Sequence, residues 1–383
     1  MGWYLLFALC SLPASAQAQA PRSPAAARAA AFAPPFFPAE LRRSVALEAG
    51  PAAPVVASGR RVFLALRSAA LVAVDVDAGK FAWRAPLASA HAPALVGDRL
   101  IVATTDTLEA LTVADGQSVW RMPLPASPAA PPLAQGELAV VALATGDVLA
   151  VSVEDGARRW QASLGAPAAN AAAGDVRTLY FAVEDGVVAL GASDGRRQWT
   201  QRVGARPTGL SLSGDRLYVG SLDNFFYGLD PATGRVRWRW RTGGDIAGAA
   251  VADAERVYFS SLDNLLRALD RNSGVQRWKL GLGARPLFTP LLVNRTLLLV
   301  GQSPELQAVW ADSGKSAGRY GLDADPGAAP VFLPGTWAGD DLLALPTAEG
   351  HLVLIGRRLS PSVAPLAALP GLAVPVTVTP PSQ

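Results

Sequence analysis

The stretch RLYVGSLDNFFYGLDPATGRVRW, residues 216–238, is followed 40 residues later by RVYFSSLDNLLRALDRNSGVQRW, residues 256–278. Both copies end in a turn segment and then Gly-x-x-x-Trp. Within each copy, β-branched and aromatic residues form short runs that are separated by turn residues, and no run has a helical period. A unit of about 40 residues built in this way predicts a repeated group of short β-strands.

The closing Gly-x-x-x-Trp occurs six times, with tryptophans spaced by 37, 40, 39, 39 and 40 residues. A seventh copy keeps its turn at Gly314 but has Gly318 where the tryptophan belongs. An eighth, partial copy covers residues 341–355. The six periodic tryptophans are Trp83, Trp120, Trp160, Trp199, Trp238 and Trp278.

Each copy divides into four strands, which in the fifth copy we expect at 209–212, 217–221, 225–230 and 236–241. Turn residues such as Asp223-Asn224 separate them. The chain is therefore predicted to be all-β, an eight-bladed β-propeller of four-stranded antiparallel blades.

The count of strands also predicts how the ring closes. The last copy supplies three strands, and a lone strand expected at 41–48 supplies the fourth, which removes an open sheet edge. The alternative is closure by residues 359–366, but Pro361 and Pro365 disfavour a paired strand there.

Composition excludes several classes of protein. The chain has 383 residues, a net charge of +3, one cysteine and two histidines. A disulfide within the chain and a Cys/His zinc site are therefore excluded. The small, scattered excess of basic residues also argues against nucleic-acid binding, and no apolar run is long enough to span a membrane.

The two ends of the chain read as segments outside the propeller. Residues 1–18 resemble a signal peptide, with an apolar run before Ala14-Ser15-Ala16, so we expect export to the periplasm or the outer membrane. Lipidation at Cys10 is the alternative, although Leu9 stands where a small residue is wanted. We expect an Ala/Pro-rich linker at 19–40, the propeller at 41–358 and a Pro-rich disordered tail at 359–383.

The segment Leu-Asp-x-x-Thr-Gly-x-x-x-Trp resembles the PQQ-like, tryptophan-docking propeller repeat over roughly residues 41–356. Two branches share this repeat, namely the quinoprotein dehydrogenases and the outer-membrane protein assembly factor BamB. The resemblance implies that the six periodic tryptophans dock adjacent blades. Trp240, Trp310 and Trp337 fall outside that position, so we expect them to be more exposed.

Nothing in the sequence predicts catalytic, cofactor-binding or metal-binding residues. The aspartates that precede the turn glycines recur once per blade, so we interpret them as turn formers rather than as a convergent acid pair. The innermost strands contain no acid, base or histidine. The resemblance implies that a quinone enzyme would need such groups, so we predict neither enzyme activity nor a cofactor.

The sequence thus predicts an exported, non-catalytic scaffold for protein–protein interaction. The resemblance implies a BamB-like role with envelope proteins, including an outer-membrane insertase, as partners of a monomer within a complex. A PQQ-dependent oxidoreductase, or a degenerate relative, is the alternative, and a sensor or adhesion propeller is a third. The candidate partner-binding residues are Arg206, Arg285 and Trp337. We expect Asp-Asn turns on the rim opposite Arg206 and Arg285.

Overall fold

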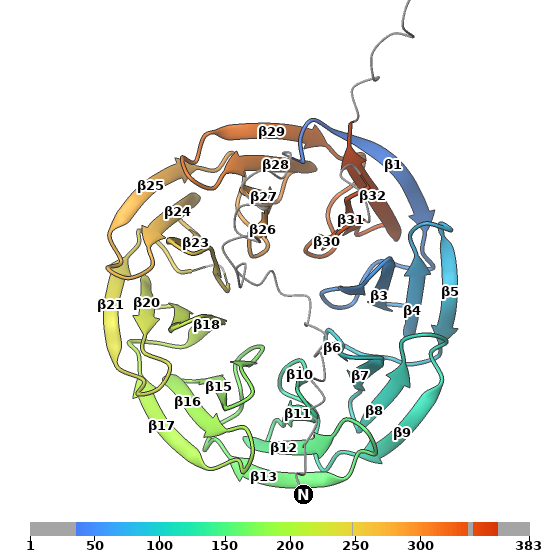
Figure 1. The fold of residues 1–383 in the computed structure, drawn as a ribbon, viewed down its shortest axis with the longest axis vertical. Helices are drawn as coiled ribbons and strands as arrows, with labels where there is room; N and C mark the ends of the chain where they lie inside the picture. Colours follow the sequence, from blue (N-terminus) through green and yellow to red (C-terminus); the bar gives the residue numbers. More distant parts are fainter. Residues whose placement is uncertain (1–35, 247, 336–339, 359–383) are drawn as a thin grey trace, which may run out of the picture.

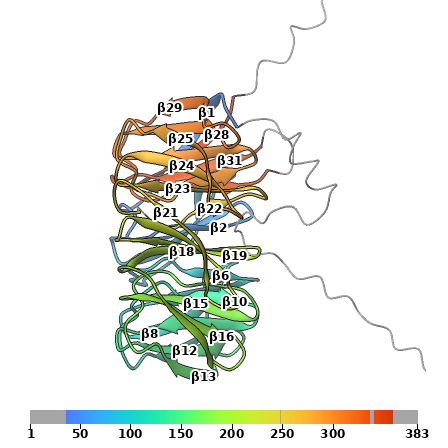
Figure 2. The same cartoon turned by 90° about the vertical axis from the view of Figure 1, so that its left-hand side faces the viewer.

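A computed structural model describes residues 36–246, 248–335 and 340–358, which form a ring of β-sheets around a central axis (Figure 1). Eight four-stranded sheets make up the ring, and every strand pairing within them is antiparallel. Seen from the side, the ring is a disc (Figure 2). The predicted class, an eight-bladed all-β propeller, is confirmed.

Each blade runs outward from a short strand at the axis. The innermost strands are β2 (Val56–Ser58), β6 (Ala94–Val96), β10 (Leu133–Gln135), β14 (Ala173–Gly174), β18 (Pro207–Ser213), β22 (Val251–Ala252), β26 (Leu291–Val293) and β30 (Val331–Leu333). The second strands are β3 (Arg61–Leu66), β7 (Arg99–Ala103), β11 (Leu138–Ala142), β15 (Thr178–Val183), β19 (Arg216–Ser221), β23 (Arg256–Ser261), β27 (Thr296–Val300) and β31 (Leu342–Pro346).

The outer half of each blade is a longer hairpin. The third strands are β4 (Ala70–Asp75), β8 (Thr107–Thr112), β12 (Asp147–Ser152), β16 (Gly186–Gly191), β20 (Phe225–Leu229), β24 (Leu265–Asp270), β28 (Glu305–Trp310) and β32 (His351–Arg357). The outermost strands are β5 (Lys80–Ala85), β9 (Ser118–Pro123), β13 (Arg158–Ser163), β17 (Arg197–Arg202), β21 (Val236–Arg241), β25 (Gln276–Gly281), β29 (Ser316–Gly321) and β1 (Ala39–Ala46).

Blades 1 to 7 follow the chain, from β2–β5 to β26–β29, and blade 8 combines β30, β31 and β32 with β1. In blade 5 the observed strands lie within two residues of those expected from the sequence. Turn chemistry explains this agreement. Asn224 has φ of 63° and Gly234 has φ of 72°, which are conformations that Asn and Gly adopt most readily.

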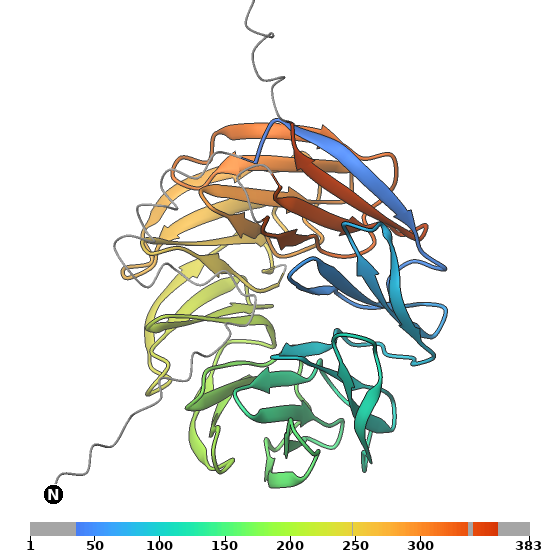
Figure 3. The ribbon, with the colours of Figure 1, turned by 45° about the vertical axis from the view of Figure 1, so that its right-hand side comes forward.

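The eighth blade brings the two ends of the ring together (Figure 3). Strand β1 pairs with β32 from Ala39 opposite Arg357 to Ala46 opposite His351. The amide of Arg358 donates to the carbonyl of Pro38 at 2.7 Å. The strand therefore begins two residues before the start expected at position 41, and the predicted 19–40 linker is too long at its C-terminal end.

The hydrophobic core is divided into eight clusters, one between each pair of neighbouring blades. Between blades 5 and 6, for example, buried Phe226 of β20 stacks on Phe259 of β23 with ring centroids 4.0 Å apart. No single blade buries its own faces, so each depends on its neighbours for stability.

Several predictions concern segments outside the described residues. The signal peptide at 1–18, the tail at 359–383, most of the linker, and Trp337 all lie there. No helix in the described part of the chain is long and apolar enough to cross a membrane.

Candidate functional site

The six periodic tryptophans lie at six of the eight junctions between blades. Each indole N–H donates to a backbone carbonyl of the following blade. The donor–acceptor pairs are Trp83–Val113 (3.1 Å), Trp120–Val153 (2.8 Å), Trp160–Ala192 (2.9 Å), Trp199–Pro231 (3.0 Å), Trp238–Arg271 (3.0 Å) and Trp278–Ala311 (3.0 Å).

Each of these indoles also covers the turn glycine of the neighbouring blade. Trp238 lies over Gly274, where an added Cβ would come within 2.7 Å of the indole ring. Gly274 has φ of 71°, so this position requires glycine for its conformation as well as for the close approach of the ring. Trp240 and Trp310, expected to be more exposed, are half-buried.

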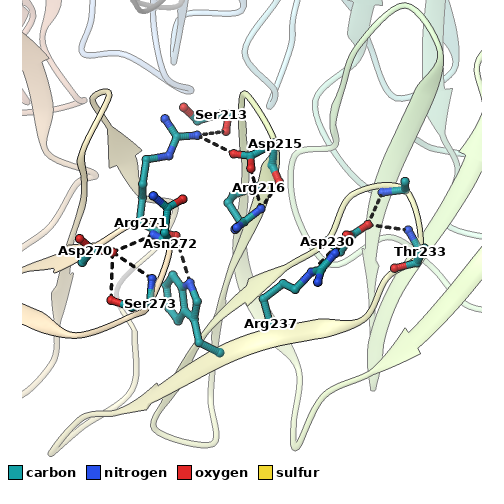
Figure 4. A network of polar contacts seen from close by, with 12 residues as sticks. Ser213, Asp215, Arg216, Asp230, Thr233, Arg237, Asp270, Arg271, Asn272 and Ser273 are labelled. Atoms are coloured by element: carbon teal, nitrogen blue, oxygen red, sulfur yellow. Dashed lines mark hydrogen bonds and ion pairs between the residues drawn. The ribbon is translucent and has the colours of Figure 1, made fainter.

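The repeated aspartates form the turns that carry these glycines. Asp230 Oδ1 accepts hydrogen bonds from the amides of Ala232 and Thr233, both at 3.0 Å, and Asp270 does the same for Asn272 and Ser273 (Figure 4). A hydrogen bond from Arg237 is the largest cause of the lowered pKa of Asp230. These carboxylates therefore serve the turns one by one and do not converge.

Figure 4 also shows how Arg271 joins two blades on this face of the ring. Its Nη1 donates to the carbonyl of Asp253 at 3.0 Å, and its Nη2 donates to the carbonyl of Ser213 at 2.7 Å. Nη2 also lies 3.2 Å from Asp215 Oδ1. We call this side, which carries the first and third turns of each blade, the turn face.

Two junctions have no tryptophan, and the sequence did not reveal what replaces it. At Gly318 of β29, the buried ring of Phe37 fills the space where a side chain would project. At the junction of blades 8 and 1, Arg43 of β1 lies against the turn residue Gly79 and donates to the carbonyl of Asp77 at 2.9 Å. Both replacements come from the N-terminal segment, outside the repeated copies.

The opposite side, which we call the link face, carries the links between blades and the second turn of each blade. Arg206 and Arg285 lie exposed in the links before blades 5 and 7. The carbonyl of Arg206 accepts a hydrogen bond from Leu222 at 3.1 Å, which places a second turn beside this link. Leu222 and Leu287 are 45% and 42% exposed. Leu222 is hydrogen-bonded to Arg206, and Leu287 follows Arg285 by two residues in the chain.

The Asp-Asn turns lie on the link face, so the prediction that they form the opposite rim is wrong. The amide of Gly243, in the link before blade 6, donates to Asp263 Oδ2 at 3.0 Å. Burial alone would raise the pKa of Asp263, but hydrogen bonds from Arg267, Ser261 and Gly243 outweigh it and lower that pKa to about 2. The carboxylate is thus held ionised between a turn and a link.

The innermost strands carry mostly small or apolar side chains, as in β6 (Ala-Leu-Val) and β26 (Leu-Leu-Val). In the described part of the chain, no group of three or more His, Cys, Asp and Glu side chains is placed to hold a metal ion. The side chains of β6 and β26 offer no carboxylate or amide oxygen, which are the ligands that a calcium ion beside a quinone would need. A cavity of about 240 Å³ lies off the axis, beside Pro286, Phe288 and Glu305.

The ring of four-stranded blades, with indoles docked over turn glycines, defines a PQQ-like β-propeller. The family model described as outer membrane protein assembly factor BamB matches residues 27–180 and 183–357, and the chain belongs to this family.

Solved structures show the same fold. BamB from Moraxella catarrhalis aligns with a TM-score of 0.67 at 19% identity, over 83% of this chain and 99% of that one. Quinohemoprotein alcohol dehydrogenase ADHIIG from Pseudomonas putida HK5 aligns with a TM-score of 0.67 at 12% identity, over 83% of this chain and 75% of that one. The computationally designed Ika8 protein aligns with a TM-score of 0.71 at 13% identity, over 82% of this chain and 98% of that one. No curated protein matches the chain.

Proposed function

We propose that this chain is an exported, non-catalytic scaffold that binds partner proteins during outer-membrane protein assembly, as a monomer within a complex. Membership of the BamB family is the observation that carries this proposal. The proposed location is the periplasm or the periplasmic side of the outer membrane. The proposed partners are envelope proteins, foremost the periplasmic domains of the outer-membrane insertase.

The link face supplies the docking surface in this proposal. Arg206 and Arg285 are exposed, and each lies near an exposed leucine, Leu222 or Leu287. Arginine beside apolar side chains suits a protein interface, because its planar head group makes several hydrogen bonds while its stem packs. The backbone directly after each arginine is fixed by strand-like pairing, because Pro207 pairs with Ser221 and Pro286 pairs with Gly301. A partner would therefore meet a preformed surface.

The test is direct binding between this protein and the purified periplasmic domains of the insertase. The variant Arg206→Glu with Arg285→Glu should bind at least about tenfold more weakly, because it replaces two attractive charges by repulsive ones. The control is Arg177→Glu, at an exposed arginine in a first turn on the turn face. Unchanged binding of the double variant, with an unchanged melting curve, would contradict the assignment of this face.

The runner-up is a PQQ-dependent oxidoreductase or a degenerate relative, which the fold shared with quinohemoprotein alcohol dehydrogenases favours. We expect no bound-quinone absorbance and no dye-linked oxidation of alcohols or sugars when the protein is mixed with PQQ and calcium. Stoichiometric quinone binding, even without turnover, would favour the oxidoreductase over the scaffold.

A further inference from the structure

The outer rim of blades 5 and 6 carries basic side chains without an ion-pair partner among the described residues, whereas basic side chains at the same repeat position in other blades are paired with glutamates. The residue directly after the docking tryptophan is basic in four blades, and blade 7, which lacks the tryptophan, has Arg319 at the same repeat position. Three of these basic side chains form an ion pair with a glutamate, in the pairs Arg84–Glu48 (2.8 Å), Arg121–Glu109 (3.7 Å) and Arg319–Glu305 (3.6 Å). Comparing the same position in different blades therefore shows which basic side chains have no acidic partner in the described part of the chain.

In blade 5 this position is Arg239, which lies opposite Tyr227, and its guanidinium sits 4.9 Å from the centre of the Phe225 ring. In blade 6 it is Lys279, which lies opposite another cation, Arg267. Arg241, two residues beyond Arg239, is exposed as well. Among the described residues, Arg239, Arg241 and Lys279 take part in no ion pair, and we call these three the basic edge.

The basic edge lies on strands with a free side. Strand β21 is the outermost strand of blade 5, and its outer side pairs with no strand among the described residues (Figure 1). A free strand edge offers backbone donors and acceptors to another extended segment. A second copy of this chain is a poor occupant of that edge, because its own arginines would lie against these.

A groove of about 510 Å³ lies beside the basic edge, where blade 4 meets blade 5. Arg202, Arg239, Phe225 and Tyr227 line it, together with Asp223. The Asp223 carboxylate is already engaged, because it accepts hydrogen bonds from the Tyr227 hydroxyl and the Phe225 amide. The groove therefore presents aromatic surface with guanidinium groups at its border.

We propose that the rim of blade 5 binds an extended acidic segment of a partner protein, which pairs with the free side of β21. Arg239 and Arg241 are two residues apart, so they project on the same side of the strand about 7 Å apart. Acidic side chains at alternate positions of an extended segment have the same spacing and meet them in register. The groove borders the link face at Asp223, but the free side of β21 lies on the outer rim and includes neither Arg206 nor Arg285. The proposal therefore goes beyond the docking role above.

The probe is a short, fluorescently labelled peptide of alternating Glu and Thr, and its binding to the full-length protein is measured by anisotropy. We expect Arg239→Gln with Arg241→Gln to weaken binding about tenfold. The matched control is Arg319→Gln, at the same repeat position in blade 7 but paired with Glu305. It should change binding less than about twofold.

Two further arms test the mode of binding. An N-methylated peptide of the same sequence keeps the charges but cannot pair along the strand, and it should bind much more weakly. Vesicles containing phosphatidylglycerol test the lipid alternative. The proposal is overturned if the double variant binds like wild type, if Arg319→Gln loses as much, if the N-methylated peptide binds equally, or if only vesicles bind. Melting curves verify that each variant is folded.

Discussion

The substitution Trp238→Ala tests the role of the interblade tryptophans most sharply. The Trp238 side chain is 8% exposed, donates to the Arg271 carbonyl at 3.0 Å, and covers Gly274. A buried tryptophan removes about 150–250 Å² from water. At about 25 cal/mol per Å², this corresponds to an upper limit of about 4–6 kcal/mol.

The measured loss should be about 3–5 kcal/mol, since the surrounding side chains relax only partly into the cavity. Trp238→Phe keeps a ring but loses the indole N–H, so it should cost less, with about 1 kcal/mol coming from the lost hydrogen bond. The assay is equilibrium unfolding in guanidinium chloride, followed by circular dichroism. The alanine variant should show the lower midpoint of the two.

Trp240→Ala is the matched control, because Trp240 lies on the same strand and is only half-buried. It should cost less than about 2 kcal/mol. If Trp238→Ala and Trp240→Ala unfold at the same midpoint, burial at the junction is not what makes the periodic position special, and the docking role fails.

Three further predictions concern Asp263, the N-terminal segment and Gly318. The pKa of Asp263 is about 2 in the folded protein and 3.8 for an unperturbed aspartate, so its stabilisation is complete above pH 4 and is lost as the pH falls towards 2. When equilibrium unfolding is measured at pH 4 and at pH 2, the free energy of unfolding of wild type should thus fall by about 2 kcal/mol more than that of Asp263→Asn. Deleting residues up to Glu48 should broaden and lower the thermal transition, whereas deleting 360–383 should not. Gly318→Trp, which restores the repeat pattern, should lower the melting temperature because Phe37 fills that space, and adding Phe37→Ala should recover part of the loss.

The fold was predictable because its signals are local and repeated. Asp230 and Gly234 determine a turn within a few residues, and their recurrence reveals the blade without any knowledge of long-range contacts. The position of the Asp-Asn turns was predictable in principle and was missed. Strands of a meander alternate in direction, so the second turn of a blade must lie on the same side as the link to the next blade.

Other features of the candidate surfaces could not be read from the sequence. Phe37 is 281 residues before Gly318 in the chain, and no spacing rule connects them. The exposure of Leu222 and Leu287 depends on how links and turns pack, since leucines at similar turn positions, such as Leu262, are half-buried. The basic edge required the side-chain contacts of the folded chain, because they show which of the repeated arginines forms an ion pair with a glutamate.

The two junctions without tryptophan both involve blade 8, and the one with blade 7 has a physical cause in how that blade is built. In every other blade the third and outer strands are joined by a turn, and its glycine forms a platform that an indole covers in blades 2 to 7 and Arg43 covers in blade 1. In blade 8 these strands are the two ends of the ring, so the turn is replaced by the hydrogen bond from Arg358 to Pro38. Among the described residues, blade 8 has no platform glycine for a tryptophan of blade 7 to cover, which explains why Gly318 is tolerated and why Phe37, entering β1, packs over it. The loss of the seventh tryptophan is therefore a consequence of where the chain begins and ends within the ring.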